Sequence, residues 1–352
     1  MWLKPPRFFC NLQQIRKCRH YRCYNGMSRS NRVDLICDWD GTLTKKDTLH
    51  LVAKVAYDKR GMPLDGDEDL YTAPLMPWRG FGEVYLEAYN RHIKSYHPAE
   101  HDRTSLTDER HWLTSLRDVE LSGVRAAEQA KLFHGVRSED VEKTALQALE
   151  SGDLELRPGW ESLFQKAASE DRNQDWRLHI LSVNWGKSFI QSVLRAAWTK
   201  HALAKGVNLP FEALGLVVRA NDIAGLRQPG GSTGKLQGTD GIDIRTSGEK
   251  LATMPARCRF NIDTAQRQPP GPEDSLVIYL GDSDTDLECL HAADIGIFMQ
   301  DDPLSSAAKK LQSAARRLGI SMRSIQEIRL DKLEYPCIWV AHDFQDVLHV
   351  FS

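Results

Sequence analysis

Short apolar runs rich in β-branched residues recur along the chain, and most are followed by a segment with helical periodicity. The runs lie at 33–37, 177–183, 214–220, 275–280, 294–299 and 337–342. Helical segments follow at 187–205 and 284–293, for example. Strands that alternate with helices are typical of a parallel sheet covered by helices on both faces. The pattern therefore predicts an α/β fold with a Rossmann-like parallel sheet.

Between residues 45 and 156 the pattern changes to long helical periodicity without a strand-like run. Phe81, Tyr85 and Tyr89 recur at every fourth position of one amphipathic segment, and Ser138 precedes another as its expected N-cap. The aromatic stripe could line a ligand pocket, but we expect it to pack between helices.

These patterns divide the chain into three parts. We predict a basic N-terminal segment at 1–32, a catalytic core at 33–44 and 157–352, and an all-helical cap domain at 45–156 inserted into that core.

The N-terminal segment differs in charge from the rest, because no acidic residue precedes Asp34. Mitochondrial presequences are rich in Arg and poor in acids. A presequence, a start of translation at Met27 and a disordered tail are equally weighted alternatives. The group Cys10, Cys18, Cys23 and His20 matches no common zinc spacing, so we expect incidental thiols. We expect a cytoplasmic protein, with mitochondrial targeting as the alternative.

The composition is that of a globular protein, and it gives no indication of binding to nucleic acid or to a membrane. The 352 residues are 41% hydrophobic and 27% charged, and the formal net charge is -2. A charge near zero gives no general attraction to nucleic acid or anionic lipid, and no apolar run is long enough to span a bilayer. The 7 cysteines lack a CxxC pair, which argues against a disulfide framework.

A glycine-rich stretch at 225–248 predicts a loop or a hairpin. Its GGSTGK sequence resembles the end of a nucleotide-binding P-loop. However, Pro229 occupies the position of the first glycine, and Leu236 follows Lys235 where Ser or Thr is needed. We therefore expect no nucleotide binding by this mechanism.

Polar groups follow three of the predicted strands. The sequence DWDGTLT begins at Asp38 after the first strand, LSVNW carries Ser182 after the second, and GDSDTD begins at Gly281 after the fourth. Ligands of open α/β sheets bind at the carboxyl ends of the strands. Several carboxylates at one point suit a hard cation, and Mg²⁺ with a substrate phosphate is the expected occupant.

The same carboxylates could catalyse phosphoryl transfer. Asp38 could attack phosphorus to give an aspartyl phosphate, and Asp40 could protonate the leaving alcohol and then deprotonate water. Taken singly, DWDGTLT could be a turn with Thr42 as a helix cap. GDSDTD could be a polar loop, or a loop with partial similarity to a calcium-binding loop. Their joint occurrence, each after its own strand, favours catalysis.

These motifs resemble those of the haloacid dehalogenase-like superfamily, in DWDGT, LSVNW and GDSDTD. The resemblance implies an α/β core with an inserted helical cap, and a phosphatase with Asp38 as nucleophile and Asp40 as acid/base. It implies that Mg²⁺ is bound by Asp38, Asp40 through its carbonyl, Asp282 and Asp286, and that the phosphoryl group is held by Thr42, Ser182, Asn184 and Lys250. The carboxylate of Asp40 speaks against the dehalogenase branch.

The lysine motif of this superfamily has two candidates. Lys250 follows Ser247, the expected cap of a short helix, whereas Lys235 lies in the glycine-rich loop. We favour Lys250. An insertion at 259–274 would account for its long separation from Asp282.

The helical insertion resembles the cap of the phosphoserine phosphatase-like group. The segments LSVNWGKSFIQSVL and YLGDSDTDLECLHAADIGIFM are similar to the phosphatase portion of plant thiamin monophosphate phosphatases and to related fungal proteins. Val183, Asn184 and Trp185 stand where phosphoserine phosphatases usually carry glycines, which argues against an amino-acid phosphate as substrate. Trp185 could stack on a substrate ring, but we expect it to pack against the loop after the first strand.

Together these features predict a Mg²⁺-dependent phosphomonoesterase that acts on a small phosphate ester. The alternatives are a phosphotransferase or mutase on the same scaffold, and a non-catalytic ligand-binding protein. The sequence favours no particular oligomeric state.

Overall fold

The structure is a computed structural model, and it describes residues 32–168, 175–254, 260–261, 266–267, 275–330, 333 and 336–350. Nearly all of the basic N-terminal segment lies outside the described residues, including Met27 and the cysteines at 10, 18 and 23. Most of the predicted insertion at 259–274 lies outside them as well.

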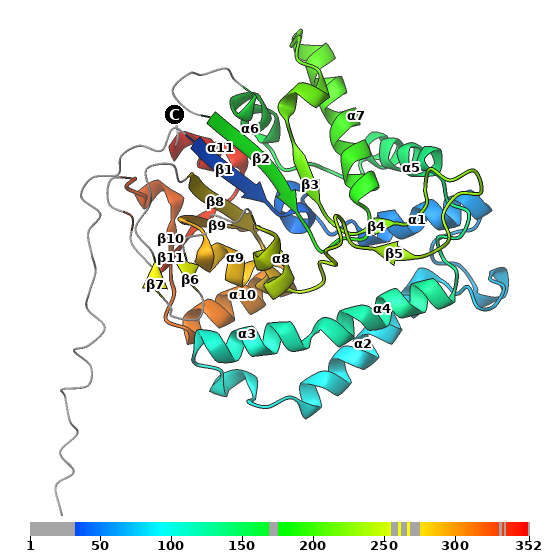
Figure 1. Ribbon diagram of the computed structural model, residues 1–352, viewed down its shortest axis with the longest axis horizontal. Helices are drawn as coiled ribbons and strands as arrows, with labels where there is room; N and C mark the ends of the chain where they lie inside the picture. Colours follow the sequence, from blue (N-terminus) through cyan, green and yellow to red (C-terminus); the bar gives the residue numbers. More distant parts are fainter. Residues whose placement is uncertain are drawn as a thin grey trace, which may run out of the picture.

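In the part of the chain that the structure describes, seven parallel strands form the central sheet, in the order β10-β11-β9-β8-β1-β2-β3 (Figure 1). The strands are β1 (Arg32–Cys37), β2 (Asp175–Leu181), β3 (Val217–Arg219), β8 (Leu276–Gly281), β9 (Ile295–Met299), β10 (Ser321–Ser324) and β11 (Cys337–Ala341). The chain runs outward from β1 to β3 on one side and then crosses to β8 on the other. This reversal of strand order makes the carboxyl end of β1 a preferred ligand site.

Burial of both sheet faces explains the continuous apolar runs. Along β1, Val33, Leu35 and Cys37 belong to one hydrophobic cluster, while Ile36 belongs to the cluster on the opposite face. Since helices cover both faces, both sets of side chains are mainly apolar. All six predicted strands are present, so the predicted α/β fold is confirmed. The seventh strand, β10, escaped prediction because its polar sequence SMRS lies at the sheet edge.

Among the described residues after the helical segment that follows β1, six helices flank the sheet. They are α6 (Trp160–Ala167), α7 (Lys187–Lys205), α8 (Ser247–Thr253), α9 (Leu287–Ala292), α10 (Ser306–Arg317) and α11 (Phe344–Val350). Helices α6, α7 and α11 contribute to the first hydrophobic cluster, and α9 and α10 contribute to the second. The predicted helix at 187–205 coincides with α7. The one predicted at 284–293 begins as a 3-10 turn, η5 (Asp284–Asp286), and continues as α9.

The segment between β1 and α6 is helical, as the periodicity indicates. We call it the helical insertion; it contains α1 (Leu49–Arg60), η2 (Glu68–Leu70), α2 (Trp78–Ser95), η3 (Glu100–Asp102), α3 (Leu106–Ser115), α4 (Arg117–Gln129) and α5 (Ser138–Ser151). In Figure 1, α2, α3 and α4 extend as a layer along one side of the sheet, whereas α1 and α5 lie near α7. The division into core and cap domains stays a prediction.

The two connections of the helical insertion run side by side. Thr44 and Leu156 form an antiparallel bridge, and the backbone amide of Lys45 donates to the Glu155 carbonyl at 3.0 Å. The predicted boundaries at 44/45 and 156/157 fall at this pairing.

The remaining short elements are η1 (Trp39–Leu43), η4 (Phe211–Leu214), η6 (Ile325–Glu327), β4 (Asp222–Ile223), β5 (Leu236–Gln237), β6 (Phe260–Asn261) and β7 (Gln266–Arg267). Strands β4 and β5 pair in antiparallel fashion, so the glycine-rich stretch forms a hairpin up to Gln237, as expected, whereas its last two residues begin α8. No described helix is long and apolar enough to cross a membrane.

Both predicted N-caps are wrong by one residue. Arg137 rather than Ser138 precedes α5, and Thr246 rather than Ser247 precedes α8. In each case an acidic side chain three residues later accepts a hydrogen bond from the cap's backbone amide, Asp140 in the first and Glu249 in the second. This hydrogen bond marks where each helix begins.

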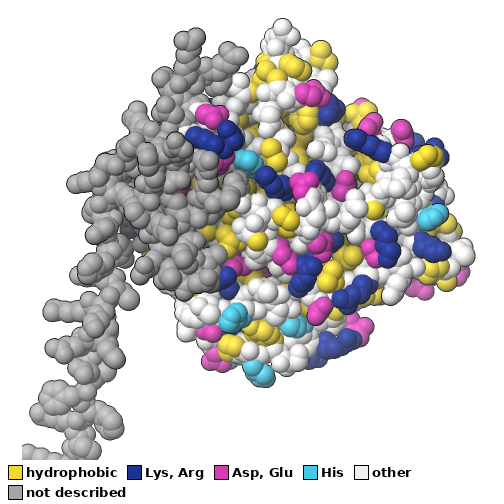
Figure 2. Space-filling model, viewed as in Figure 1, with side chains coloured by type: hydrophobic (Ala, Val, Ile, Leu, Met, Phe, Trp, Pro, Cys, Tyr) yellow, Lys and Arg dark blue, Asp and Glu magenta, His cyan; other side chains and the backbone are white. Residues whose placement is uncertain are grey.

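Charged side chains of both signs are interspersed on the face that Figure 2 shows. Among the described residues visible there, neither sign forms an extended surface.

Candidate active site

The predicted site residues gather at the carboxyl end of the central strands. Asp38 directly follows β1, and its amide donates to the Leu280 carbonyl of β8 at 2.9 Å. Ser182 follows β2, and Asp282 follows β8. Parallel neighbours end at the same edge of a sheet, so loops that are distant in sequence meet there.

A buried lysine connects two of these carboxylates. Lys250 on α8 is fully buried, and its Nζ lies 2.7 Å from Asp286 Oδ1 and 3.0 Å from Asp38 Oδ1. Burial alone would lower the pKa of Lys250, but the two carboxylates raise it above its ordinary value, so the ammonium stays charged. Lys235, the alternative motif lysine, is exposed and pairs with Glu128 at 2.8 Å. The structure therefore brings Lys250, and not Lys235, to Asp38.

Asp38 has a raised pKa because it is buried and because Asp286 and Asp282 repel its negative charge, although Lys250 counteracts both. Its Oδ1 has the ion pair with Lys250 but accepts no hydrogen bond from the described residues. A carboxylate in this setting becomes a stable anion when a cation binds beside it.

Asp40 is held by hydrogen bonds to both of its oxygens. Oδ1 accepts from the amide of Thr48 at 2.7 Å and from its hydroxyl at 2.6 Å, and Oδ2 accepts from Asn184 Nδ2 at 2.8 Å. Burial and the nearby Asp47 raise the pKa of Asp40 to about 7, although these hydrogen bonds counteract the rise. A carboxyl group with this pKa can both give and take a proton near neutral pH.

Thr48 was missed in the sequence because no motif distinguishes it among the polar residues before α1. Its hydroxyl also accepts a hydrogen bond from Trp39 Nε1 at 2.8 Å. The indole of the DWDGT motif therefore orients the hydroxyl that orients Asp40.

The four residues expected to hold the phosphoryl group have different partners. Lys250 has been placed above, and the Ser182 hydroxyl accepts from the Asn184 amide at 3.1 Å. Thr42 donates to Asp282 Oδ1 at 3.1 Å, and Asn184 donates to Asp40. In the structure, Thr42 and Asn184 thus orient carboxylates, and phosphate binding by these side chains stays a prediction.

Asp286 has its hydrogen-bonding capacity filled by the protein. It accepts from Lys250 and from the Tyr279 hydroxyl at 2.7 Å, from the Ser283 hydroxyl at 2.9 Å, and from the amides of Ser283 and Asp282 at 3.1 and 3.2 Å. Asp286 therefore fixes the loop that presents Asp282.

The acidic group fits a divalent cation. Oxygens of Asp38, Asp282 and Asp286 lie within 4.8 Å of one another. Burial and repulsion by Asp286 raise the pKa of Asp282 to about 8, because its ionisation would add more buried negative charge than Lys250 neutralises. Hard oxygen donors with unmet charge are the ligands that Mg²⁺ prefers.

Gly41 allows the two loops to meet closely. Its φ is +70°, and a Cβ at this position would lie 2.3 Å from Asp282 Oδ2. Only glycine avoids both the left-handed strain and this clash.

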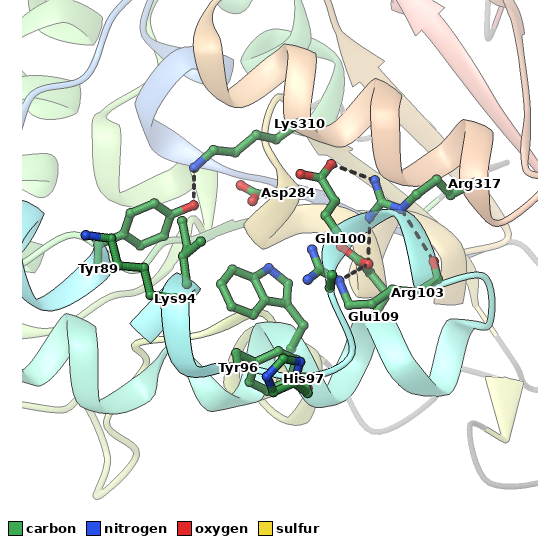
Figure 3. A pocket seen from close by; sticks show the side chains of 13 residues that line it. Tyr89, Lys94, Tyr96, His97, Glu100, Arg103, Glu109, Asp284, Lys310 and Arg317 are labelled. Atoms are coloured by element: carbon green, nitrogen blue, oxygen red, sulfur yellow. Dashed lines mark hydrogen bonds and ion pairs between the residues drawn. The ribbon is translucent and has the colours of Figure 1, made fainter. Parts of the chain in front are cut away.

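A cavity of about 290 Å³ lies between the helical insertion and the core (Figure 3). Tyr89 of α2 and Trp112 of α3 contribute from the insertion, and Lys310 of α10 contributes from the core. Asp284 also lines it, from the loop that carries Asp282 and Asp286. Lys310 Nζ donates to the Tyr89 hydroxyl at 2.8 Å across the cavity's edge. Asp284 is the residue through which the cavity is connected to this loop; Asp38, Asp282 and Asp286 do not line it.

The aromatic stripe has two environments. Phe81 packs in the core beside Trp78, with ring centroids 5.8 Å apart, as expected for packing between helices. Tyr85 donates to Glu120 of α4 at 3.0 Å and stacks on Tyr89 at 6.1 Å. The packing prediction is therefore incomplete, because Tyr89 lines the cavity.

Trp185 packs, as predicted, but against different residues. Its ring lies edge-on to Trp78 at 6.3 Å, and a Cβ on Gly123 of α4 would lie 3.7 Å from it. The Trp185 ring therefore packs against the helical insertion.

Comparisons with known proteins give distant relatives. No family model matches the chain. "Cold tolerance protein 1" of Saccharomyces cerevisiae is 23% identical over 315 residues, which cover 84% of this chain and 87% of the relative. A "CTO1 family protein" of Schizosaccharomyces pombe is 24% identical over 266 residues, covering 75% and 81%. Both agree with the expected similarity to fungal proteins.

Solved hydrolase structures resemble the chain only weakly. A phosphoserine phosphatase structure has a TM-score of 0.39 at 15% identity and covers 90% of this chain and 98% of its own. A phosphoserine phosphohydrolase-like protein from Francisella tularensis has a TM-score of 0.42 at 14% identity, covering 91% and 100%. TM-scores this low do not assign a function to the chain. The link to plant thiamin monophosphate phosphatases stays a prediction.

Proposed function

We propose that this protein is a Mg²⁺-dependent phosphomonoesterase that hydrolyses a small phosphate ester through an aspartyl phosphate on Asp38. The observation that carries the proposal is the position of Lys250 Nζ, within 3.0 Å of Asp38 Oδ1 and 2.7 Å of Asp286 Oδ1. A nucleophilic carboxylate, a fixed cation and a separate acid/base are the parts that phosphoryl transfer needs.

In the first step, an oxygen of Asp38 attacks phosphorus, and the bond from phosphorus to the leaving alcohol breaks. Asp40 donates its proton to the departing oxygen. The pKa of about 7 supports this role, because a large fraction of Asp40 is protonated at neutral pH.

In the second step, Asp40 takes a proton from a water molecule, which attacks phosphorus and releases Asp38. Asn184 and Thr48 keep Asp40 in one orientation for both steps. Lys250 supplies positive charge for the phosphoryl oxygens, where charge accumulates.

Asp38, Asp282 and the Asp40 carbonyl would hold Mg²⁺, with Asp286 supporting Asp282. When bound, Mg²⁺ supplies further positive charge to the phosphoryl oxygens. The unmet negative charge of the acidic group supports this assignment.

The helical insertion would act as a cap, which opens to admit the ester and closes to exclude bulk water. The organic part of the substrate would extend from Asp38 towards the cavity lined by Asp284, Tyr89 and Lys310.

Phosphate release from a panel of esters tests the proposal. The panel contains thiamin monophosphate, pyridoxal phosphate, phosphoserine, sugar phosphates and p-nitrophenyl phosphate, each with Mg²⁺ and with EDTA. We expect Mg²⁺-dependent release by the wild type and by Asp153→Asn, an exposed carboxylate outside the site, and none by Asp38→Asn. Activity retained by correctly folded Asp38→Asn would refute the proposal.

A further inference from the structure

A buried arginine lies where the chain returns from the helical insertion to the core. Arg157 is 2% exposed, and its amide donates to the Leu43 carbonyl at 2.8 Å. The preceding residue, Leu156, forms the bridge to Thr44. Arg157 is therefore the first core residue after the paired connections.

The guanidinium group of Arg157 binds three loops at once. Nε donates to the Thr42 carbonyl at 2.9 Å, and Nη2 donates to the Gly41 carbonyl at 2.5 Å. Nη1 and Nη2 reach Asp301 at 2.6 and 3.2 Å, and Nη1 also donates to the His342 carbonyl at 3.0 Å. The loop after β1 is thereby fastened to the loops after β9 and β11.

Two of the three carbonyls held by Arg157, those of Thr42 and Gly41, belong to residues that touch Asp282. The Thr42 hydroxyl donates to Asp282 Oδ1 at 3.1 Å, and Gly41 approaches so closely that a Cβ would clash with Oδ2. Asp40 immediately precedes Gly41. A displacement of this loop would therefore move Asp40 and the contacts of Asp282 together.

We infer that Arg157 is a positioning residue, which holds the loop of residues 39–43 against the core beside the paired connections of the helical insertion. It thereby sets the geometry of the acidic group. Its effect on catalysis rests on the proposed function, whereas its effect on cation binding does not. Support of this kind typically changes metal affinity or activity by about 10- to 100-fold.

Lysine cannot replace this arginine. The planar guanidinium directs donors to five oxygens in fixed directions, whereas a lysine ammonium has three donors at one point. Arg157→Lys keeps the positive charge beside Asp301 but leaves buried carbonyls unpaired. The substitution therefore tests the hydrogen-bond geometry of Arg157 separately from its positive charge.

The chain offers a matched control in Arg60. Its guanidinium also donates to two backbone carbonyls, those of Ala56 at 2.6 Å and Lys131 at 3.1 Å, but both lie in the helical insertion. Arg60→Lys makes the same chemical change away from the paired connections.

Mg²⁺ binding by calorimetry and hydrogen exchange of the peptide around residues 39–43 test the inference. We expect Arg157→Lys to weaken Mg²⁺ binding about tenfold or more and to speed exchange in this peptide, with no change in Arg60→Lys. Asp301→Asn, which keeps all three carbonyl bonds of Arg157, should have the same effect at smaller size, and it tests the inference if Arg157→Lys does not fold. Unchanged Mg²⁺ affinity and exchange in the folded variants would overturn the inference.

Ester hydrolysis by the same proteins separates the two proposals. A fall in kcat of about tenfold in Arg157→Lys, with KM changed less, supports positioning of the catalytic groups. Wild-type kcat in Arg157→Lys would overturn positioning and leave the phosphatase proposal standing. If Arg157→Lys binds Mg²⁺ more weakly but the wild type hydrolyses no ester, the phosphatase proposal is refuted and the positioning role of Arg157 stands.

Discussion

Asn184 Nδ2 donates a hydrogen bond of 2.8 Å to Oδ2 of Asp40, across the gap between the loops after β2 and β1. We predict that Asn184→Ala lowers kcat by about tenfold or more, because the proposed acid/base loses its fixed orientation. Thr48→Val, which removes a hydroxyl from the other oxygen, should act in the same direction. Steady-state kinetics with p-nitrophenyl phosphate measure this, and an unchanged kcat in both variants would contradict the role of Asp40.

Removal of the Lys250 ammonium should destabilise the fold as well as abolish activity. In Lys250→Met, Asp38 and Asp286 lose their buried counter-charge, which costs about 3–5 kcal/mol of unfolding free energy. Lys235→Met is the matched control, since that exposed lysine pairs with Glu128 at the surface, and such pairs contribute about 1 kcal/mol or less. Urea unfolding of both variants gives the comparison. Equal losses would mean that Lys250 is not a buried counter-ion.

Gly41→Ala should disrupt cation binding specifically. Gly41 and Gly61 both have positive φ, +70° and +66°, but a Cβ on Gly61 meets nothing within 4 Å. Both substitutions should cost about 1 kcal/mol of stability through backbone strain. Only Gly41→Ala should also displace Asp282 and weaken Mg²⁺ binding, by about tenfold or more. Calorimetry that finds equal Mg²⁺ affinity in the two variants would contradict the close approach of Gly41 to Asp282.

The ionisation of Glu120 makes the stability of the fold decrease as the pH rises. Burial raises its pKa from 4.5 to about 7, although the hydrogen bond from Tyr85 and the charge of Arg245 counteract the rise. The folded state then holds a proton that the unfolded state releases between these values, so wild-type stability falls as the pH rises from about 4.5 to 7.

Glu120→Gln removes this titration and keeps an oxygen that can accept from Tyr85. We predict that its stability relative to the wild type is greater at pH 8 than at pH 5, by on the order of 1–3 kcal/mol. Denaturant unfolding at the two pH values measures the difference. The same relative stability at both would mean that Glu120 titrates normally.

The apolar runs predicted the sheet because burial on both faces leaves only one kind of sequence for its inner strands. The gathering of Asp38, Ser182 and Asp282 was predictable for a related reason, since parallel strands end at one edge. Neither argument reaches β10, whose exposed polar residues carry no periodic signal.

The partners of individual side chains were not predictable in this way. Whether Asn184 faces a phosphate or Asp40 depends on the relative height of two loops, which no local pattern encodes. Arg157 lies in the sequence LELRPGW, which matches no motif, and its five acceptors come from three distant loops. The cap of α8 was within reach, because Thr246 and Glu249 form the capping-box spacing.

Oxygen exchange between phosphate and water tests the role of Asp38 most directly, because it requires no knowledge of the substrate. If Asp38 attacks inorganic phosphate labelled with ¹⁸O, one oxygen leaves as water, and hydrolysis of the aspartyl phosphate brings in one unlabelled oxygen from the solvent. The account predicts progressive loss of label, followed by mass spectrometry, for the wild type with Mg²⁺ and for Asp153→Asn, and none for Asp38→Asn. Equal loss of label in wild type and folded Asp38→Asn would contradict the central claim that Asp38 is the nucleophile.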